Sequence, residues 1–183
     1  MNLLYFAEII LDKSRLKKGY SKPTQNRTAL PICAGTPTTV FPARTYIVPD
    51  GWEKSEKHST NSQIFYIEEG HENDEKPDNI SIHVGKNKYS LDEHEQFRDA
   101  IVQQILMQLD GIEAQLNGDG TYTEQGDLLY IFTIDEGDIV TTQYYIVRDY
   151  GFCLIQLTNF SGSETTEQAA RDMVDSFVWD TEG

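Results

Sequence analysis

Histidine and cysteine are the residue types whose spacing most often reveals a catalytic or metal site. No two of the four histidines have a spacing typical of a zinc site, and no H-E-x-x-H motif occurs; they are His58, His71, His83 and His94. Cys33 and Cys153 lack the histidine arrangement of a thiol nucleophile, and no G-x-S-x-G elbow or phosphate-binding glycine loop is found. We therefore expect a protein that is not an enzyme and needs no cofactor.

Carboxylates are the next candidates, and they are densest around His71. An EF-hand Ca²⁺ loop needs oxygen ligands at alternate positions and glycine at the sixth, an order that this segment lacks. A second group, Asp135, Glu136 and Asp138, has the form of a hairpin turn rather than of a paired-carboxylate site. We predict a solvated acidic loop and no metal centre. If a metal did bind, its ligands would come from Glu68, Glu69, Glu72 and Asp74.

Charge is distributed unevenly over the 183 residues, whose formal net charge is −15. Residues 1–57 carry nine Lys/Arg against five Asp/Glu, whereas residues 58–183 carry six against twenty-five. A chain with this much negative charge repels phosphate backbones and anionic lipids. We therefore expect no nucleic-acid partner and no stable membrane insertion. A basic protein partner is favoured, although a solvated surface that resists aggregation is the simpler interpretation.

The N-terminal sequence bears on location. No stretch approaches the roughly 20 apolar residues of a membrane-spanning helix. Residues 2–11 are apolar, but Glu8 interrupts them and no basic segment precedes them, unlike a signal peptide. We expect a cytoplasmic protein, and an envelope location stays open if a leader is missing from the sequence.

The elements that must position any site are clearest between Leu128 and Asn159. Three strands are predicted there, at Leu128–Ile134, Ile139–Arg148 and Phe152–Asn159, joined by tight turns. Because the first two carry apolar residues on both faces, the sheet must be covered on both sides. Helices are predicted at 90–110, with a capping box from Ser90 to Glu93, at 164–178 and at 2–18.

These elements predict an α+β fold, a three-layer α/β/α sandwich with a mostly antiparallel sheet of about six strands. Residues 1–37 form an N-terminal helix plus linker in this interpretation, and residues 38–183 form the domain. Asn117–Gly120 reads as a turn before a strand at Tyr122. Further strands are predicted at Thr38–Val48, where Pro42 indicates a sheet edge, and at Ser62–Ile67 and Asn79–Val84.

Four features follow one another along the chain: the turn Pro49–Trp52, the strand Asn79–Val84 before the Ser90-capped helix, the meander Leu128–Asn159, and a closing helix that ends in Met173–Phe177. This order resembles the PsbP-like superfamily, which includes the bacterial DcrB-type proteins. The resemblance covers Thr38 to Trp179 and rests also on Gly51-Trp52, Gly126 with Tyr130, Tyr145 and Ser176-Phe177. It implies an α/β/α sandwich and members that are mostly non-enzymatic, among them photosystem subunits, actinobacterial lipoproteins and type VI secretion chaperones.

The function we predict combines the missing catalytic signature with this resemblance. It is a bacterial protein-binding module, such as a secretion-associated chaperone, immunity-like factor or adaptor, whose partner is basic or carries an apolar helix. Ten tyrosines and eight phenylalanines supply candidate contacts, although each alone is more readily explained as core. The candidates are Tyr144, Tyr145, Tyr150 and Trp52. The alternative is an envelope protein that binds a small molecule or lipid, similar to the PsbP-like lipoproteins.

Overall fold

The computed structural model describes residues 39–41 and 44–180. Within these residues there are two α-helices, one 3-10 turn at Leu91–Glu93, and two antiparallel sheets. The larger sheet has the strand order β3-β4-β5-β9-β8-β7-β6, and the smaller one β1-β2-β10. The elements are β1 (Thr39–Phe41), β2 (Arg44–Tyr46), β3 (Trp52–Lys54), β4 (Gln63–Glu68), β5 (Asn79–Lys86), α1 (His94–Gln108), β6 (Gln115–Tyr122), β7 (Leu128–Asp135), β8 (Val140–Arg148), β9 (Gly151–Asn159), α2 (Glu164–Asp175) and β10 (Val178–Trp179).

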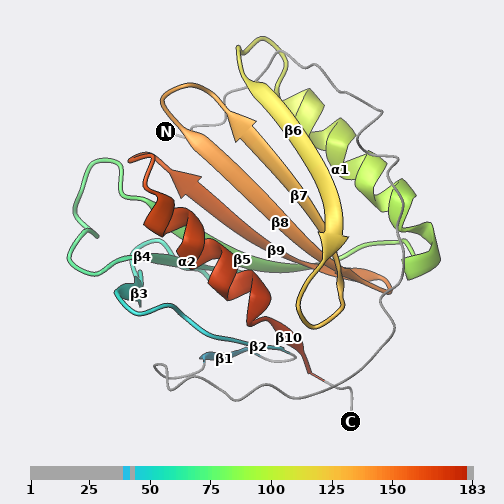
Figure 1. The fold of residues 1–183 in the computed structure, drawn as a ribbon, viewed down its shortest axis with the longest axis horizontal. Coiled ribbons are helices and arrows are strands. Elements are labelled where there is room, and N and C mark those ends of the chain that lie inside the picture. The colour runs from blue at the N-terminus through green and yellow to red at the C-terminus, as the bar shows by residue number, and fades with distance from the viewer. Residues whose placement is uncertain (1–38, 42–43, 181–183) are drawn as a thin grey trace.

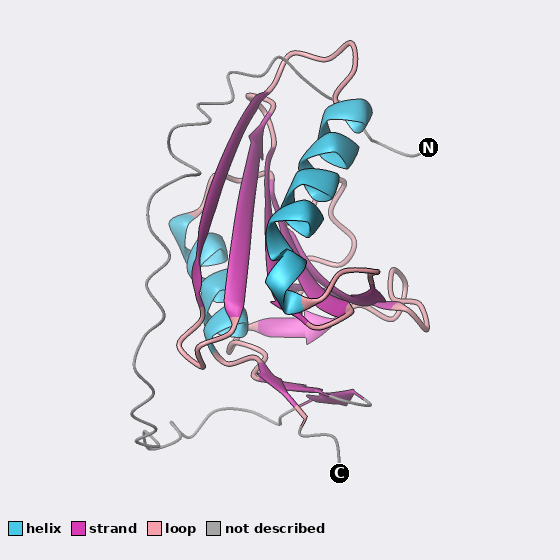
Figure 2. Ribbon diagram, turned by 90° about the vertical axis from the view of Figure 1, so that its right-hand side faces the viewer, coloured by secondary structure: helices cyan, strands magenta, loops and turns pink. Residues whose placement is uncertain are grey.

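The two helices lie on opposite faces of the larger sheet (Figures 1 and 2). The predicted three-layer sandwich is therefore confirmed, with seven strands in the central sheet rather than about six. The three strands of the meander form as predicted, as antiparallel neighbours. The predicted N-terminal helix at 2–18 and the linker to residue 37 lie outside the described residues.

Consecutive strand residues point to opposite faces, so the sheet supports two separate cores. The core under α1 is centred on β7 and β8 and contains Phe97, Ile101, Val102, Ile105, Leu109, Leu128, Tyr130, Phe132, Ile134, Tyr145 and Val147. The core under α2 extends across β4, β5, β8 and β9 and contains Trp52, Ile64, Tyr66, Ile80, Ile82, Tyr144, Ile146, Cys153, Ile155, Leu157, Ala170, Met173, Val174 and Phe177. Each helix thus covers a different part of the sheet.

Local sequence signals account for both helices. The Glu93 carboxylate accepts hydrogen bonds from the backbone amide and hydroxyl of Ser90, so the capping box forms, one 3-10 turn ahead of α1. Gly111, with φ 88°, follows the end of α1 where the chain needs a left-handed conformation. The closing helix predicted at 164–178 ends earlier, at Asp175, because the chain turns at Ser176 into β10. Ala170, Met173 and Val174 of α2, and Phe177 after it, are buried in the core.

Two strand predictions were wrong in detail. Asn117–Gly120 is no turn, because it pairs with Thr133–Tyr130 of β7 in the middle of β6. Its two glycines are tolerated because β6 stands last in the order of the larger sheet, where less side-chain packing is demanded. The segment Thr38–Val48 is not one long strand but contributes β1 and β2 to the smaller sheet, which β10 completes.

Asp78 ties the loop before β5 to the loop that leads from β9 into α2. Its carboxylate accepts hydrogen bonds from the backbone amides of Phe160 and Ser161, at 2.6 and 3.0 Å, and from the hydroxyls of Ser161 and Thr166. These contacts join segments more than 80 residues apart. They fix the start of α2 against the sheet.

We predict that Asp78→Ala lowers the free energy of unfolding by about 2–3 kcal/mol, because the donors of a half-buried carboxylate lose their acceptor. Asp78→Asn should cost less, since one amide oxygen still serves the two backbone donors. Urea titrations monitored by circular dichroism would measure both. The exposed turn variant Asp138→Asn is the control, and equal effects at the two positions would contradict the role assigned to Asp78.

Candidate binding groove

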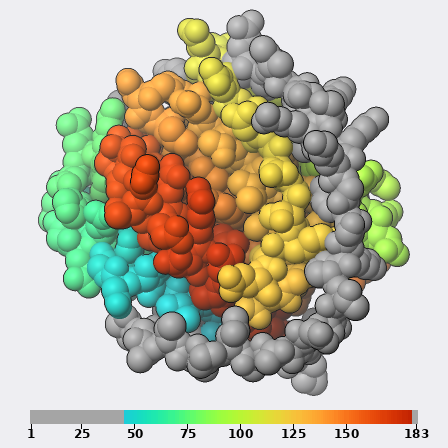
Figure 3. Space-filling view, viewed as in Figure 1, coloured from blue at the N-terminus to red at the C-terminus, as the bar shows by residue number. Residues whose placement is uncertain are grey.

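A groove of about 790 Å³ lies between α2 and the segment that connects β2 to β3. These two parts of the chain lie side by side on one face of the molecule (Figure 3). Its lining comes from three places, the 47–52 segment, the end of β4 with the loop after it, and the exposed side of α2. The lining residues are Ile47, Val48, Pro49, Asp50, Gly51, Trp52, Glu68, Glu69, His71, Thr165, Gln168, Ala169 and Asp172.

The wall formed by residues 47–52 is held at both ends by hydrogen bonds. The backbone amide of Ile47 donates to the Ser176 hydroxyl at the end of α2, at 3.0 Å, and that hydroxyl donates to the Met173 carbonyl. At the other end, the amide of Trp52 donates to the carbonyl of Pro49 across a tight turn. Gly51 takes φ 82° in this turn, a conformation that favours glycine. The wall is therefore a fixed feature of the domain.

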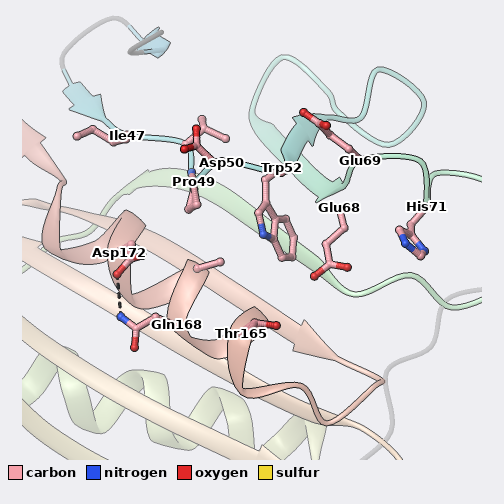
Figure 4. Close-up of a pocket in the computed structure, with 13 residues that line it drawn as sticks. Ile47, Pro49, Asp50, Trp52, Glu68, Glu69, His71, Thr165, Gln168 and Asp172 are labelled. Atoms are coloured by element: carbon pink, nitrogen blue, oxygen red, sulfur yellow. Dashed lines mark hydrogen bonds between the residues drawn. The ribbon is translucent and has the colours of Figure 1, made fainter. Parts of the chain in front are cut away.

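Trp52 and Glu68 are cross-strand partners in the β3–β4 pair. The Trp52 side chain is only 9% exposed and belongs to the core under α2, so it joins the groove to the core. In Figure 4 the Glu68 side chain points toward α2 and lies beside the indole. The Thr166 hydroxyl lies 3.4 Å from the Glu68 carboxylate and 3.1 Å from that of Asp78. The β4 end, α2 and the groove thus share one hydrogen-bonded corner.

The groove combines apolar lining with acidic groups. Ile47, Val48, Pro49, Trp52 and Ala169 supply apolar surface, and no Lys or Arg occurs among the lining residues that the structure describes. The acidic groups are Asp50, Glu68, Glu69 and Asp172, of which Asp172 accepts a hydrogen bond of 2.7 Å from Gln168 (Figure 4). Such a groove favours a ligand that is positively charged and partly apolar.

His71 is the one lining residue that titrates near neutral pH. Its Nδ1 lies 2.7 Å from the Asp74 carboxylate, and this hydrogen bond raises the pKa of the exposed imidazole. Protonation of His71 therefore extends to higher pH than for an isolated histidine. As pH falls through this pKa, one positive charge is added at the edge of the groove, next to the carboxylates.

The predicted contact residues do not form one surface. Tyr144 and Tyr145 are 5% and 6% exposed and belong to different cores, one on each face of the sheet. They face opposite sides of the sheet, because neighbouring strand residues point in opposite directions. Tyr150 is 60% exposed in the β8–β9 turn, and Trp52 lines the groove. Whether any of these residues binds a partner stays a prediction.

The four carboxylates named as possible metal ligands also separate. Glu68 and Glu69 reach the groove, whereas Glu72 accepts a 2.6 Å hydrogen bond from the Ser55 hydroxyl, which lowers the pKa of its carboxyl. Asp74 is paired with His71. Over residues 39–41 and 44–180, no group of three or more His, Cys, Asp or Glu side chains is arranged to hold a metal ion.

Sequence reasoning named Trp52, Glu68 and Glu69 for separate reasons and did not bring them together. Asp50 and Asp172 were missed as site residues. The turn at Asp50 and a strand at Ser62–Ile67 were predicted, with Glu68 in the loop after that strand. The structure instead extends this strand to Glu68 and pairs Glu68 with Trp52 of β3. Nothing in the local sequence signals Asp172, because its position depends on how α2 crosses the sheet.

No protein-family model and no curated protein sequence matches the chain. Solved structures do match its fold. Cyanobacterial PsbP (CyanoP) from Synechocystis sp. PCC 6803 has a TM-score of 0.51 and 15% identity, covering 75% of this chain and 87% of that one. LpqN, involved in cell envelope biogenesis of Mycobacterium tuberculosis, has a TM-score of 0.50 and 16% identity, and the match covers 81% of this chain and 88% of that one. The chain has a PsbP-like fold, as the resemblance predicted.

Burial makes Tyr145 a reporter of the core under α1, since it raises the pKa of the phenol to about 12. In the unfolded chain, the Tyr145 phenol ionises near pH 10. Between about pH 10 and 12 the unfolded chain therefore binds fewer protons than the folded chain, so the free energy of unfolding falls as pH rises. In that window the free energy of unfolding of the original chain should fall by about 1.4 kcal/mol per pH unit, and we predict that Tyr145→Phe removes this fall. Urea unfolding from about pH 9 to 11.5 would measure it. Tyr150→Phe is the exposed control, and an unchanged alkaline slope in Tyr145→Phe would contradict the prediction.

Proposed function

We propose that the chain is a non-enzymatic binding protein whose groove takes a basic, partly apolar segment of a protein partner. The observation that carries this proposal is the groove itself, with apolar lining and four carboxylates but no Lys or Arg among its described lining residues. An apolar side chain of the partner would contact Trp52 and Ala169, and flanking Lys or Arg would lie near Glu69 and Asp172. This division between an apolar centre and a charged rim is typical of protein interfaces.

The asymmetry of charge supports the same proposal. With net charge −15, the chain attracts cationic partners over long range, and the carboxylates of the groove concentrate that attraction where apolar contact is also available. Electrostatic complementarity of this kind raises association rates and excludes acidic competitors. A chaperone or adaptor that holds a basic amphipathic segment needs both properties.

A second candidate is the binding of a small molecule. The groove volume of about 790 Å³ falls within the range of small-molecule sites, and LpqN is a protein of cell envelope biogenesis. The carboxylates disfavour anionic lipids and would select a cationic or neutral amphiphile instead. No helix among the described residues is long and apolar enough to span a membrane.

A pair of designed peptides tests the protein-binding proposal. One alternates Lys with Leu, and the other carries Glu in place of every Lys. We expect the Lys peptide to bind with an affinity that falls as salt rises, and the Glu peptide not to bind. Titration calorimetry on the full chain would measure both. Glu69→Lys/Asp172→Lys should weaken binding of the Lys peptide about 5- to 30-fold, since two rim contacts become repulsive.

The matched control makes the same change of net charge outside the groove, in the exposed residues Asp110 and Asp138. If Asp110→Lys/Asp138→Lys weakens binding of the Lys peptide as much as the groove variant does, the electrostatic attraction comes from the whole chain and the groove is not the binding site. Native mass spectrometry of the purified chain addresses the second candidate. A bound small molecule that the groove variant releases would favour small-molecule binding over the protein partner.

A further inference from the structure

Charge in this chain changes sign where the described residues begin. Residues 1–38 carry six Lys/Arg and two Asp/Glu, whereas residues 39–183 carry nine Lys/Arg and twenty-eight Asp/Glu. The formal net charge is therefore +4 before residue 39 and −19 from residue 39 on. All six cations fall within residues 13–27, which contain no Asp or Glu. A domain with this much negative charge attracts the basic part of its own chain.

Residues 13–27, which we name the basic segment, also carry apolar side chains. Leu16 and Tyr20 lie among the cations, and the apolar residues 2–11 come shortly before them. A basic and partly apolar segment is the class of ligand that the groove favours. The chain therefore contains a candidate occupant for its own groove.

The elements that line the groove carry a large excess of negative charge. Twelve Asp/Glu and three Lys/Arg occur in residues 47–54, 68–78 and 164–175. Two of these cations are paired with other acids, Lys54 with Glu56 at 2.7 Å and Arg171 with Glu167 at 3.4 Å. The third, Lys76, stands against six acids within residues 68–78. Neighbouring cations therefore do not cancel the negative potential of the groove.

The N-terminal part of the chain joins the domain beside the groove. Thr39, the first residue of β1, pairs with Tyr46 of β2, and the next residue, Ile47, is part of the groove lining. Antiparallel partners have Cα atoms about 5 Å apart and consecutive residues about 3.8 Å, so Thr39 lies within about 9 Å of Ile47. The hydrogen bond from Ile47 to Ser176 fixes this point against the end of α2. Residue 38 is therefore attached next to the groove wall.

The chain is long enough for the basic segment to reach every part of the groove. Eleven residues, 28–38, separate the segment from Thr39. Fully extended, they span up to about 36 Å. Helix α2, which forms one side of the groove, has 12 residues and is about 18 Å long. The connection therefore exceeds the length of that side.

We propose that the basic segment occupies the groove of the same molecule. Glu69, after β4, and Asp172, on α2, lie on different walls of the groove (Figure 4) and match the cations of the segment. The apolar lining around Trp52 matches Leu16 or Tyr20, and the volume of about 790 Å³ is ample for either side chain. The inference rests on the proposed function, because it assigns an occupant of the same class to the same groove.

A partner must then compete with the chain itself for the groove. A short connection gives the segment an effective concentration on the order of 1 mM. With a dissociation constant on the order of 100 µM, the segment fills the groove in about nine-tenths of the molecules and weakens a competitor about tenfold. Because the attraction is partly ionic, occupation decreases as salt rises.

Carbodiimide crosslinking of the full chain tests the contact directly. The reagent joins a lysine amine to a neighbouring carboxylate, and mass spectrometry of the peptides identifies both residues. We expect links from the lysines of the basic segment to Glu69 or Asp172, within monomers, and fewer of them at high salt. Equal linkage to the exposed acids Asp110 and Asp138 overturns the proposal. Links found only in covalent dimers overturn it as well, because the segment would then come from another copy.

Binding of the Lys peptide measures the same contact by competition. The segment variant Lys17→Glu/Lys18→Glu should bind this peptide about tenfold more tightly than the original chain, because its groove is vacated. The matched control, Lys86→Glu/Lys88→Glu, makes the same change of net charge in exposed lysines at the opposite end of β5 from Glu68. Titration calorimetry would compare the three chains. An equal gain in the control and the segment variant overturns the proposal, since the gain would then come from overall charge.

The two experiments separate this inference from the proposed function. If the Lys peptide binds the original chain and the segment variant equally, and no groove links form, this inference is overturned and the proposed function stands. If groove links form but the segment variant does not bind the Lys peptide, the inference is supported and the proposed function is contradicted.

Discussion

Strands β7 and β8 carry large apolar side chains at consecutive positions, so neither face of the sheet can be left in water. Tyr144 and Ile146 require cover on one side, and Tyr145 and Val147 require it on the other. A single helix cannot cover both faces, and α1 and α2 lie on opposite faces of the sheet. Every other feature of the domain is arranged around that two-sided burial.

The groove follows from how α2 covers its face. Its buried side packs on the sheet through Ala170, Met173 and Val174, and Ser176 at its end ties down the 47–52 segment. The segment then crosses beside the helix without regular pairing until β3 begins at Trp52. A groove between an irregular segment and the exposed side of a helix can differ in charge and shape between proteins without any change in the two cores. This freedom explains how one fold can serve different binding functions.

Sequence reasoning was strongest where one physical signal decides the structure. The apolar pattern of Leu128–Ile134 required two-sided cover, and the capping box at Ser90 placed the start of the helix at 90–110, which forms as α1. It failed at Asn117–Gly120, where turn-forming residues are overridden by pairing with β7. It also did not separate Tyr144 from Tyr145, which the alternation of a strand places in different cores. Asp172 could not be placed, since only the tertiary position of α2 brings it to the groove that Trp52 also lines.

Trp52 has a double role that decides how the groove can be studied. Its indole belongs to the core under α2 and also lines the groove, so replacing it would disturb folding and binding together. The same holds for Ala169, which is 5% exposed. The carboxylates at Glu69 and Asp172 are exposed and lie outside both cores, so their charge can be changed while the apolar contacts remain. In the proposed binding function, charge at the rim of the groove would set specificity, so we expect these two residues to carry the selectivity, while the stability of the fold depends on the sheet beneath.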